Sequence, residues 1–309
     1  MPCLAWLRNG NPIEPEEVQQ AAGKFRVAIV QPWETEAARY LSEHGTTVLA
    51  YQCLSSVRVY EPGPVFSSGL SAAQASALGT NTGMEWQGYP GHFQQEVWRD
   101  DYADAWVNNV VSLIDESPFD GVFADNDVFD DYYGTGIDIR LMRRGLDALI
   151  TKAGQALNDR GKLLIPNIAE GRVKPGRWRS HARFGGGFEE CLFAWGTEPG
   201  ERLSLDDMLA QVDQLHGPGL VIARIPGTNV ELALAAAWVF APQADLAVTA
   251  TWNDHADAMP WTPLGDVDLG DPLSPLFTTH EPGQYSREFT GGRAVVDLNT
   301  LTGSIEIYA

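Results

Sequence analysis

The chain has 309 residues, of which 44% are hydrophobic and 20% are charged, so it can build a sizeable core and is not intrinsically disordered. This length suits one large domain, such as an α/β barrel of roughly 250 residues, or two ordinary domains. The formal net charge of −20 would repel nucleic-acid phosphates and anionic lipid head groups, which excludes nucleic acid and membrane surfaces as expected partners.

The N-terminal segment MPCLAWLRNGNP lacks the basic flank and the apolar run of a secretory signal peptide. No stretch approaches the ~20 apolar residues that a membrane span needs. From this sequence we therefore expect a cytoplasmic protein, or one that is released by cell lysis or attached to a larger particle such as a virion. Cys3, Cys53 and Cys191 are widely spaced and have no CxxC pattern, so the sequence predicts free thiols, no metal site and no cofactor.

Short apolar runs alternate with helical patterns along most of the chain, which is typical of βαβ units around a parallel sheet. The expected strands are residues 24–31, 46–52, 84–89, 119–125, 162–169, 187–195, 220–226 and 245–252. The expected helices are residues 34–43, 102–116, 138–159, 204–215 and 229–240. Eight strands with outer helices favour a (β/α)8 TIM barrel over an open doubly wound sheet, because the sequence also lacks a GxGxxG turn and a P-loop.

Three stretches fall outside the expected catalytic barrel, which spans residues 24–258. Residues 1–23 are expected to form an N-terminal extension. Residues 61–83, which are rich in Gly, Ser and Ala, are expected to form a long loop after the second strand. Residues 259–309 combine a Pro- and Gly-dense irregular segment with a β-hairpin, and we expect this appendage to pack on the barrel.

Acidic residues gather near the expected C-terminal strand ends, where α/β barrels place their active sites. They are Glu34, Asp125, Asp127, Glu170, Glu189, Glu190 and Asp254. In the fourth expected strand, the two-residue period puts Asp125 on the same face as Phe123, which predicts an inward carboxylate at the barrel mouth. The alternative is that Asp125 only caps the following turn.

The sixth expected strand contributes two glutamates, Glu189 and Glu190, inside the apolar run FEECLF. One of them must face the barrel interior, where burial would raise its pKa and suit it to general acid catalysis. The alternative is a structural ion pair with Arg183 or Arg224. An aspartate and a glutamate facing each other across a barrel mouth are the minimal apparatus for glycoside hydrolysis.

Aromatic and polar side chains at the same strand ends favour a sugar substrate. Trp33, Trp86, Trp195 and Trp252 fall at or just beyond strand ends, where their flat faces could stack on sugar rings. The further candidates for substrate binding are Glu34, Tyr51, Tyr89, Asp127, Asn167 and Arg224.

The stretch PFDGVFADNDVFDD does not match the motifs that other functions would require. A calcium-binding EF-hand loop that began at Asp125 would need Asp or Asn where Phe129 stands and Glu where Gly136 stands. An aspartyl-phosphate phosphatase would need Thr or Val at Phe129. The GxSxG and HExxH patterns of serine hydrolases and zinc proteases are missing from the sequence.

Five segments resemble, in order, the glycosyl-hydrolase-like family fifteen. They are VLAYQCLSSVR, FSSGLSAAQA, EWQGYPGHFQQEVWRDDYADAW, FDGVFADND and DVDLGDPLSP. The element DGVFADN is also similar to the more distant endo-α-1,4-polygalactosaminidase family. This resemblance implies a (β/α)8 glycoside hydrolase with Asp125 as nucleophile and Glu189 as acid, with Glu190 as the alternative acid. Relatives found in actinobacteria and among phage tail proteins imply a bacterial cell-surface polysaccharide as the substrate.

The sequence thus predicts a metal-independent glycoside hydrolase that cleaves a polysaccharide or oligosaccharide with a carboxylate pair, and retention is favoured over inversion. A catalytically silent carbohydrate-binding module, such as a phage tail receptor-binding domain, is the alternative. An isomerase or aldolase on the same barrel is a weaker third possibility, because IPGTNVE is a poor match for a phosphate-binding loop.

Overall fold

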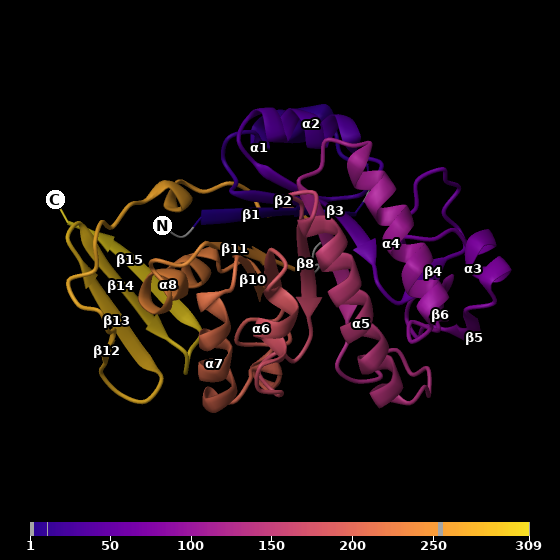
Figure 1. Ribbon diagram of the computed structural model, residues 1–309. Helices are drawn as coiled ribbons and strands as arrows, with labels where there is room; N and C mark the ends of the chain where they lie inside the picture. The colour runs from indigo at the N-terminus through magenta and orange to yellow at the C-terminus, as the bar shows by residue number, and fades with distance from the viewer. Residues whose placement is uncertain (1–2, 11, 253–255, 309) are drawn as a thin grey trace.

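The fold is a closed barrel of eight parallel strands, in the order β1-β11-β10-β9-β8-β7-β3-β2 (Figure 1). The computed structural model describes residues 3–10, 12–252 and 256–308. The barrel strands are β1 (Cys3–Arg8), β2 (Val27–Val30), β3 (Thr47–Cys53), β7 (Gly121–Asp127), β8 (Leu163–Ile168), β9 (Gly186–Glu189), β10 (Leu220–Pro226) and β11 (Leu246–Thr251). The expected (β/α)8 barrel is confirmed.

Helices connect the strands and cover the outside of the barrel. They are α1 (Pro15–Ala21), α2 (Thr35–Glu43), α4 (Asp100–Asp115), α5 (Ile139–Asn158), α6 (Arg177–Ala182), α7 (Leu205–Val212) and α8 (Val230–Phe240), with a short 3-10 helix η2 (Asp213–His216) after α7. Helix α4 shows why the sequence folds this way. Its apolar stripe of Tyr102, Trp106, Val110 and Ile114 is buried, while acidic residues occupy its first turn.

The N-terminal segment differs from its expected role as an extension. Residues Cys3–Arg8 form β1, which pairs with β11 on one side and β2 on the other and so closes the barrel. The run from Lys24 is therefore the second strand. The strand expected at residues 84–89 is wrong as a barrel strand, because Asn81–Glu85 (β5) is mostly exposed and pairs elsewhere. A strand inside a parallel barrel must be buried on both faces, and this segment lacks the side chains for that.

A small antiparallel sheet lies between β3 and α4, with β6 (His92–Gln95) between β4 (Ser56–Arg58) and β5. The expected long loop at residues 61–83 contains a helix, α3 (Ala72–Leu78). A capping box formed by Ser71 and Gln74 begins this helix, and Gly79 in the left-handed region ends it. This excursion brings side chains over the barrel mouth.

The C-terminal appendage is a four-stranded antiparallel sheet that packs on α8 (Figure 1). Its strands are β12 (Thr278–Thr279), β13 (Gln284–Phe289), β14 (Gly292–Asp297) and β15 (Thr302–Ile307). Between the barrel and this sheet, α8 is buried along almost its whole length, which explains why it is apolar on every face. Trp238 of α8 meets Phe289 edge-on at 5.0 Å between ring centroids.

Apolar side chains fill the barrel interior below the mouth. Phe123 of β7 and Phe188 of β9 meet edge-on at 5.2 Å, and Ile165 of β8 packs in the same buried cluster. One two-residue step further along each strand, the inward positions become polar, with Asp125, Asn167 and Glu190. The apolar layer therefore forms the floor of the site, and the polar layer lies at the mouth.

Candidate active site

Asp125 lies near the C-terminal end of β7 and is almost fully buried. It lines the larger of two adjoining cavities over the barrel mouth, which are described below as the larger and the smaller cavity. Its carboxylate accepts hydrogen bonds from several described residues. The donors include the Tyr51 hydroxyl at 2.5 Å, the Asn126 main-chain and side-chain nitrogens at 2.8 and 2.9 Å, and the Asn167 side chain at 2.9 Å. Hydrogen bonds of this kind stabilise an ionised carboxylate and hold it in one orientation.

Glu189 and Glu190 differ in their surroundings. Glu190 lines the larger cavity together with Asp125. Glu189 follows Phe188 and lies on the other face of β9, where its main-chain neighbour Cys191 donates to its carboxylate at 3.2 Å. Burial raises the pKa of Glu189 to about 7, against the opposing effect of that hydrogen bond and of the Arg172 charge.

One amide nitrogen connects Asp125 and Glu190. The Asn167 side-chain nitrogen donates to Asp125 Oδ1 at 2.9 Å and to Glu190 Oε2 at 2.7 Å. These two carboxylate oxygens are therefore at most about 5.6 Å apart, which is the distance they would have if the two hydrogen bonds were collinear. Because an amide nitrogen donates its two hydrogens at an angle, the oxygens lie closer together than this limit.

The larger cavity has a volume of about 740 Å³ and opens over the barrel mouth. One wall comes from the small sheet and its loops, which contribute Arg58, Tyr60, Glu61, Trp86, Tyr89 and His92. The lining also includes Trp33 and the segment around Asn9. Trp86 stacks on Tyr133 with ring centroids 3.8 Å apart, so this wall is packed rather than open.

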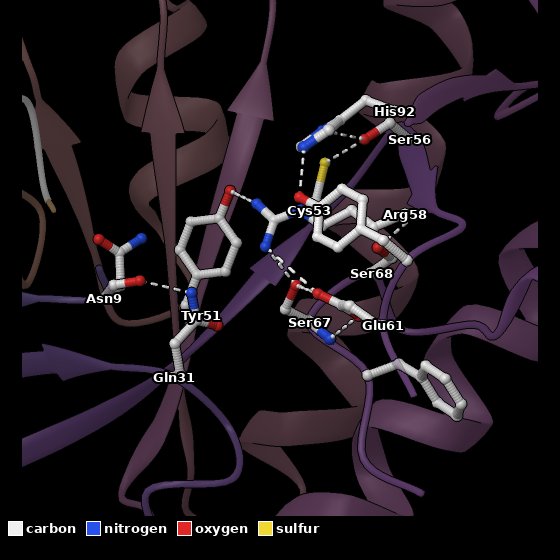
Figure 2. Close-up of polar contacts among 12 residues, drawn as sticks. Asn9, Gln31, Tyr51, Cys53, Ser56, Arg58, Glu61, Ser67, Ser68 and His92 are labelled. Carbon is white, nitrogen blue, oxygen red and sulfur yellow. Dashed lines mark hydrogen bonds and ion pairs between the residues drawn. The ribbon is translucent and has the colours of Figure 1, made fainter. Parts of the chain in front are cut away.

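Figure 2 shows a polar network within this wall, centred on the Arg58 guanidinium. Arg58 donates to the Tyr51 hydroxyl at 2.9 Å and to Ser67 Oγ at 2.5 Å, and it pairs with Glu61 at 3.4 Å. Burial, reinforced by the negative charge of Asp125, raises the pKa of Tyr51 well above its usual range. Tyr51 therefore keeps its proton and donates a hydrogen bond to Asp125, while its oxygen accepts a hydrogen bond from Arg58.

His92 is a neutral polar group in the same wall (Figure 2). Burial, followed by the nearby Arg58 charge, lowers its pKa to about 4. Its ring nitrogens lie 3.4 Å from Ser56 Oγ and 2.9 Å from the Tyr60 hydroxyl. At neutral pH the wall thus presents an uncharged imidazole.

A smaller cavity of about 150 Å³ adjoins the larger one. The two cavities share Asn126, Tyr133, Glu190 and Cys191 in their linings, so the shared wall includes Glu190 and lies beside Asp125. The side chains found only in the smaller cavity include Tyr132, Asn167, Glu170, Arg172, Glu189 and Trp195. Arg172 pairs with Glu170 at 2.6 Å and lies over the Trp195 ring, with 5.5 Å to its centroid.

Asp127 belongs to a buried ion network outside both cavities. Its carboxylate pairs with Arg177 at 2.7 Å and with His181 Nδ1 at 2.6 Å, both from α6. The other ring nitrogen of His181 lies 2.8 Å from Asp147 of α5. Burial disfavours the His181 cation and the Arg177 charge opposes it as well, but the charge of Asp127 and the hydrogen bonds with both aspartates outweigh these effects and raise the His181 pKa to about 9.

This network predicts a stability that depends on pH. A histidine whose folded pKa lies above its ordinary value stabilises the fold fully below about pH 6.5, and this contribution is lost as the pH rises through about 9. The free energy of unfolding of the wild type, minus that of His181→Gln, should therefore fall by about 3 kcal/mol across this window. Denaturant unfolding of both proteins at several pH values measures this difference.

His44→Gln is the matched control, because His44 is exposed near the end of α2. This variant shows how the same substitution outside the Asp127 network changes stability over the same pH window. A difference for His181→Gln that does not fall across the window would contradict the charged histidine.

The site residues predicted from the sequence lie in different places in the structure. Asp125, Glu190, Trp33, Tyr51, Trp86 and Tyr89 line the larger cavity, and Glu189, Asn167 and Trp195 line the smaller one. Asp127, Arg224 and Trp252 line neither cavity, and Glu34 lies in a depression between α1 and α2. Arg224 is buried and donates to Thr251 and to the main-chain oxygen of Glu190. Asp254 is outside the described residues.

Sequence reasoning missed several residues of the larger cavity. Arg58, Tyr60, Glu61 and His92 belong to the excursion between β3 and α4, where the sequence predicted a loop and a weak strand. The RVYE run, which begins with Arg58 at the end of β4 and follows β3 by a few residues, was the available signal, because a cation and an aromatic residue beyond a barrel strand end are well placed for a ligand. Asn126 was adjacent to Asp125, yet its left-handed backbone, with φ of 68°, gave no sequence signal.

Within the described part of the chain, the acidic, cysteine and histidine side chains form no group of three or more that could hold a metal ion. Over the same residues, the helices are too short or too polar to cross a membrane. Cys53 is buried, whereas Cys3 and Cys191 are half-buried, and the structure records no disulfide among the three.

Comparison with known proteins gives one family match. The model of hypothetical glycosyl hydrolase family 15 matches residues 45–293, which is most of the chain. No curated protein matches the sequence.

Several solved structures are similar in fold. The glycoside hydrolase domain of PelA from Pseudomonas aeruginosa has a TM-score of 0.54 at 14% identity, covering 84% of this chain and 98% of that one. Ega3 of Aspergillus fumigatus, in complex with galactosamine, has a TM-score of 0.51 at 13% identity, covering 84% and 93%. An α-amylase from Geobacillus thermoleovorans, in complex with acarbose, has a TM-score of 0.51 at 8% identity, covering 91% and 78%. At these identities the likeness concerns the fold.

Proposed function

This chain belongs to hypothetical glycosyl hydrolase family 15, and from that premise we propose that it hydrolyses a polysaccharide with retention, using Asp125 and Glu190 as its carboxylate pair. The observation that carries this proposal is the Asn167 side chain, whose single nitrogen donates to both carboxylates. It holds one acid from the fourth barrel strand and one from the end of the sixth at a common site.

The carboxylate separation supports retention. Retaining glycosidases place their two carboxyl groups about 5 to 5.5 Å apart, whereas inverting enzymes need about 6.5 to 9.5 Å to admit a water molecule. The bridged oxygens of Asp125 and Glu190 are at most about 5.6 Å apart, which is nearer to the separation of retaining enzymes than to that of inverting ones.

We assign Asp125 as the nucleophile. Its carboxylate is held by Tyr51, Asn126 and Asn167, so its orientation is fixed before the substrate binds. In the first step a carboxylate oxygen attacks the anomeric carbon, and the glycosidic C–O bond breaks as a glycosyl ester forms. In the second step water attacks the same carbon and releases Asp125.

We assign Glu190 as the acid and base. It gives its proton to the departing glycosidic oxygen in the first step and takes one from the attacking water in the second. Glu189, whose pKa suits an acid, lies on the opposite face of β9 from the position that faces Asp125, and we therefore place it outside the reacting pair.

The substrate that we propose is a glycan of a bacterial cell surface. Among proteins of similar fold, Ega3 was solved with galactosamine, so polymers of galactosamine belong among the candidates. Trp33 and Tyr89, both partly exposed in the larger cavity, offer flat faces for sugar rings. Trp195 offers another on the far side of Glu190, so we place the glycan across both cavities.

This placement predicts that Trp195→Ala lowers kcat/KM on a polysaccharide about tenfold, because one stacking contact is lost. An aryl glycoside with a single sugar should be affected much less. Trp252→Ala is the matched control, since Trp252 is also an exposed tryptophan beyond a barrel strand end but lines neither cavity. Equal losses in both variants would contradict the placement.

The proposed function is tested by incubating the protein with arabinan, galactan, galactosamine polymers and bacterial cell-wall polysaccharides, and by measuring released reducing ends. We expect products from at least one glycan, and NMR of the first product should show the anomer of the substrate. Glycan binding without any product would leave a catalytically silent binding module instead. A product of the opposite anomer would contradict retention.

A further inference from the structure

Strand β7 contains a β-bulge directly after Asp125. Ala124 pairs with Pro166 of β8 and Asp127 pairs with Ile168, so β7 uses one more residue than β8 over this step. The extra residue lies at Asn126, whose φ of 68° is in the left-handed region. Bulges bend a strand and re-aim its side chains, and backbone of this kind persists only where the surroundings hold it.

The bulge decides which way two aspartates point. In a regular strand Phe123, Asp125 and Asp127 would all face the barrel interior, because side chains alternate with a period of two. With the extra residue inserted, Asp125 stays inside, and Asp127 reaches outward to α6. The same bulge gives Asn126 its position, from which its main-chain and side-chain nitrogens donate to the two oxygens of Asp125.

Buried ion pairs of Asp127 with Arg177 and His181 hold the outward side of the bulge. Arg177 donates to the carboxylate of Asp127 at 2.7 Å and to its main-chain oxygen at 2.9 Å, and it also reaches Ala169 O, beyond the end of β8, at 3.3 Å. His181 binds the second carboxylate oxygen of Asp127 at 2.6 Å. The side chains of Asp127, Arg177 and His181 are at most 6% exposed, so solvent screens these pairs little.

We propose that Asp127, Arg177 and His181 are positioning residues for the proposed nucleophile, holding the bulge at Asn126 from outside the barrel and thereby setting the hydrogen bonds on Asp125. This inference rests on the proposed function of Asp125. It explains why a buried ion network lies directly behind the reacting side of the strand, although Asp127, Arg177 and His181 line neither the larger nor the smaller cavity.

The test compares two substitutions on the two sides of one histidine. Asp127→Asn removes the charge that holds the bulge. Asp147→Asn removes the outer partner of His181, which also lies 3.8 Å from Arg177, but it leaves the contacts of Arg177 and His181 with Asp127 in place. We expect Asp127→Asn to lower kcat by about 10 to 100-fold with KM changed less than about threefold, because a misaligned nucleophile slows chemistry more than binding. Asp147→Asn should keep kcat within about twofold.

A second variant covers the case in which Asp127→Asn fails to fold. Arg177→Lys keeps the charge but cannot bind the carboxylate and the main-chain oxygens of Asp127, Val128 and Ala169 together, so kcat should again fall, by less than in Asp127→Asn. A kcat equal to that of the wild type in folded Asp127→Asn or in Arg177→Lys would overturn the proposal. So would equal losses of kcat in Asp127→Asn and Asp147→Asn.

An NMR measurement that needs no catalytic turnover tests this inference independently of the proposed function. The carboxyl ¹³C resonance of Asp125, assigned by its loss in Asp125→Asn, should move in Asp127→Asn or Arg177→Lys and stay in place in Asp147→Asn. If the wild type cleaves no glycan but the resonance moves as expected, the proposed function fails and the positioning role stands. A resonance that stays in place in both bulge variants overturns the positioning role, whatever the activity.

Discussion

Asparagine in place of Asp125 is expected to lower kcat by at least about 10⁴-fold on any glycan that the wild type cleaves, because removal of a covalent nucleophile has effects of this size. The side chain keeps its shape but loses its negative charge. The substitution also replaces one acceptor of the Tyr51, Asn126 and Asn167 hydrogen bonds with a donor. Initial rates of reducing-end release, measured well below the unfolding temperature, test this expectation.

Asp130→Asn is the matched control for this variant. Asp130 lies five residues further along, is exposed, and accepts a hydrogen bond from its own loop. Its activity should stay within about twofold of the wild type, since exposed substitutions away from the site have small effects. If Asp125→Asn keeps comparable activity, Asp125 is not the nucleophile.

A second experiment identifies the role of Asp125 directly. In Asp125→Gly the carboxylate is absent, and added azide can attack the anomeric carbon in its place. Partial recovery of activity, with a glycosyl azide of inverted configuration as product, is the expected result for a retaining enzyme. Recovery without any glycosyl azide would contradict the assignment.

Glu190→Gln is expected to lower kcat on a polysaccharide by about 10² to 10⁴-fold, the usual contribution of a general acid. The loss should be much smaller on an aryl glycoside with an acidic phenol as leaving group, because such a group departs without a proton. The basic limb of the pH profile should also disappear for that substrate. Rates on both substrates across the pH range measure these effects.

Glu189→Gln is the control for this assignment, with the same substitution one residue earlier. Glu189 lies on the other face of β9, so its loss should cost less than about tenfold and should not depend on the leaving group. If Glu189→Gln lowers kcat more than Glu190→Gln does, and only the loss in Glu189→Gln depends on the leaving group, then Glu189 is the acid and Glu190 is not.

Local patterns in the sequence predicted much of the barrel. Strands such as Leu220–Pro226 and Leu246–Thr251 are short apolar runs between helices with one apolar stripe, and these patterns depend only on neighbouring residues. The N-terminal strand Cys3–Arg8 was missed, because only its pairing with β11, the last strand of the barrel, shows that it closes the barrel. The strand expected at residues 84–89 was wrong, because a short run cannot reveal which sheet it joins.

The sequence by itself determined the fold class, the inward direction of Asp125, and the presence of a second carboxylate at Glu189 or Glu190. These follow from periodicity along single strands, which is a local property. Only the tertiary structure decided that Glu190 shares Asn167 with Asp125, that Arg58 and Tyr51 support the site, and that Asp127 faces away from it. The bulge at Asn126 and the packing of α6 produce this outcome, and both depend on contacts between residues that are far apart in the chain.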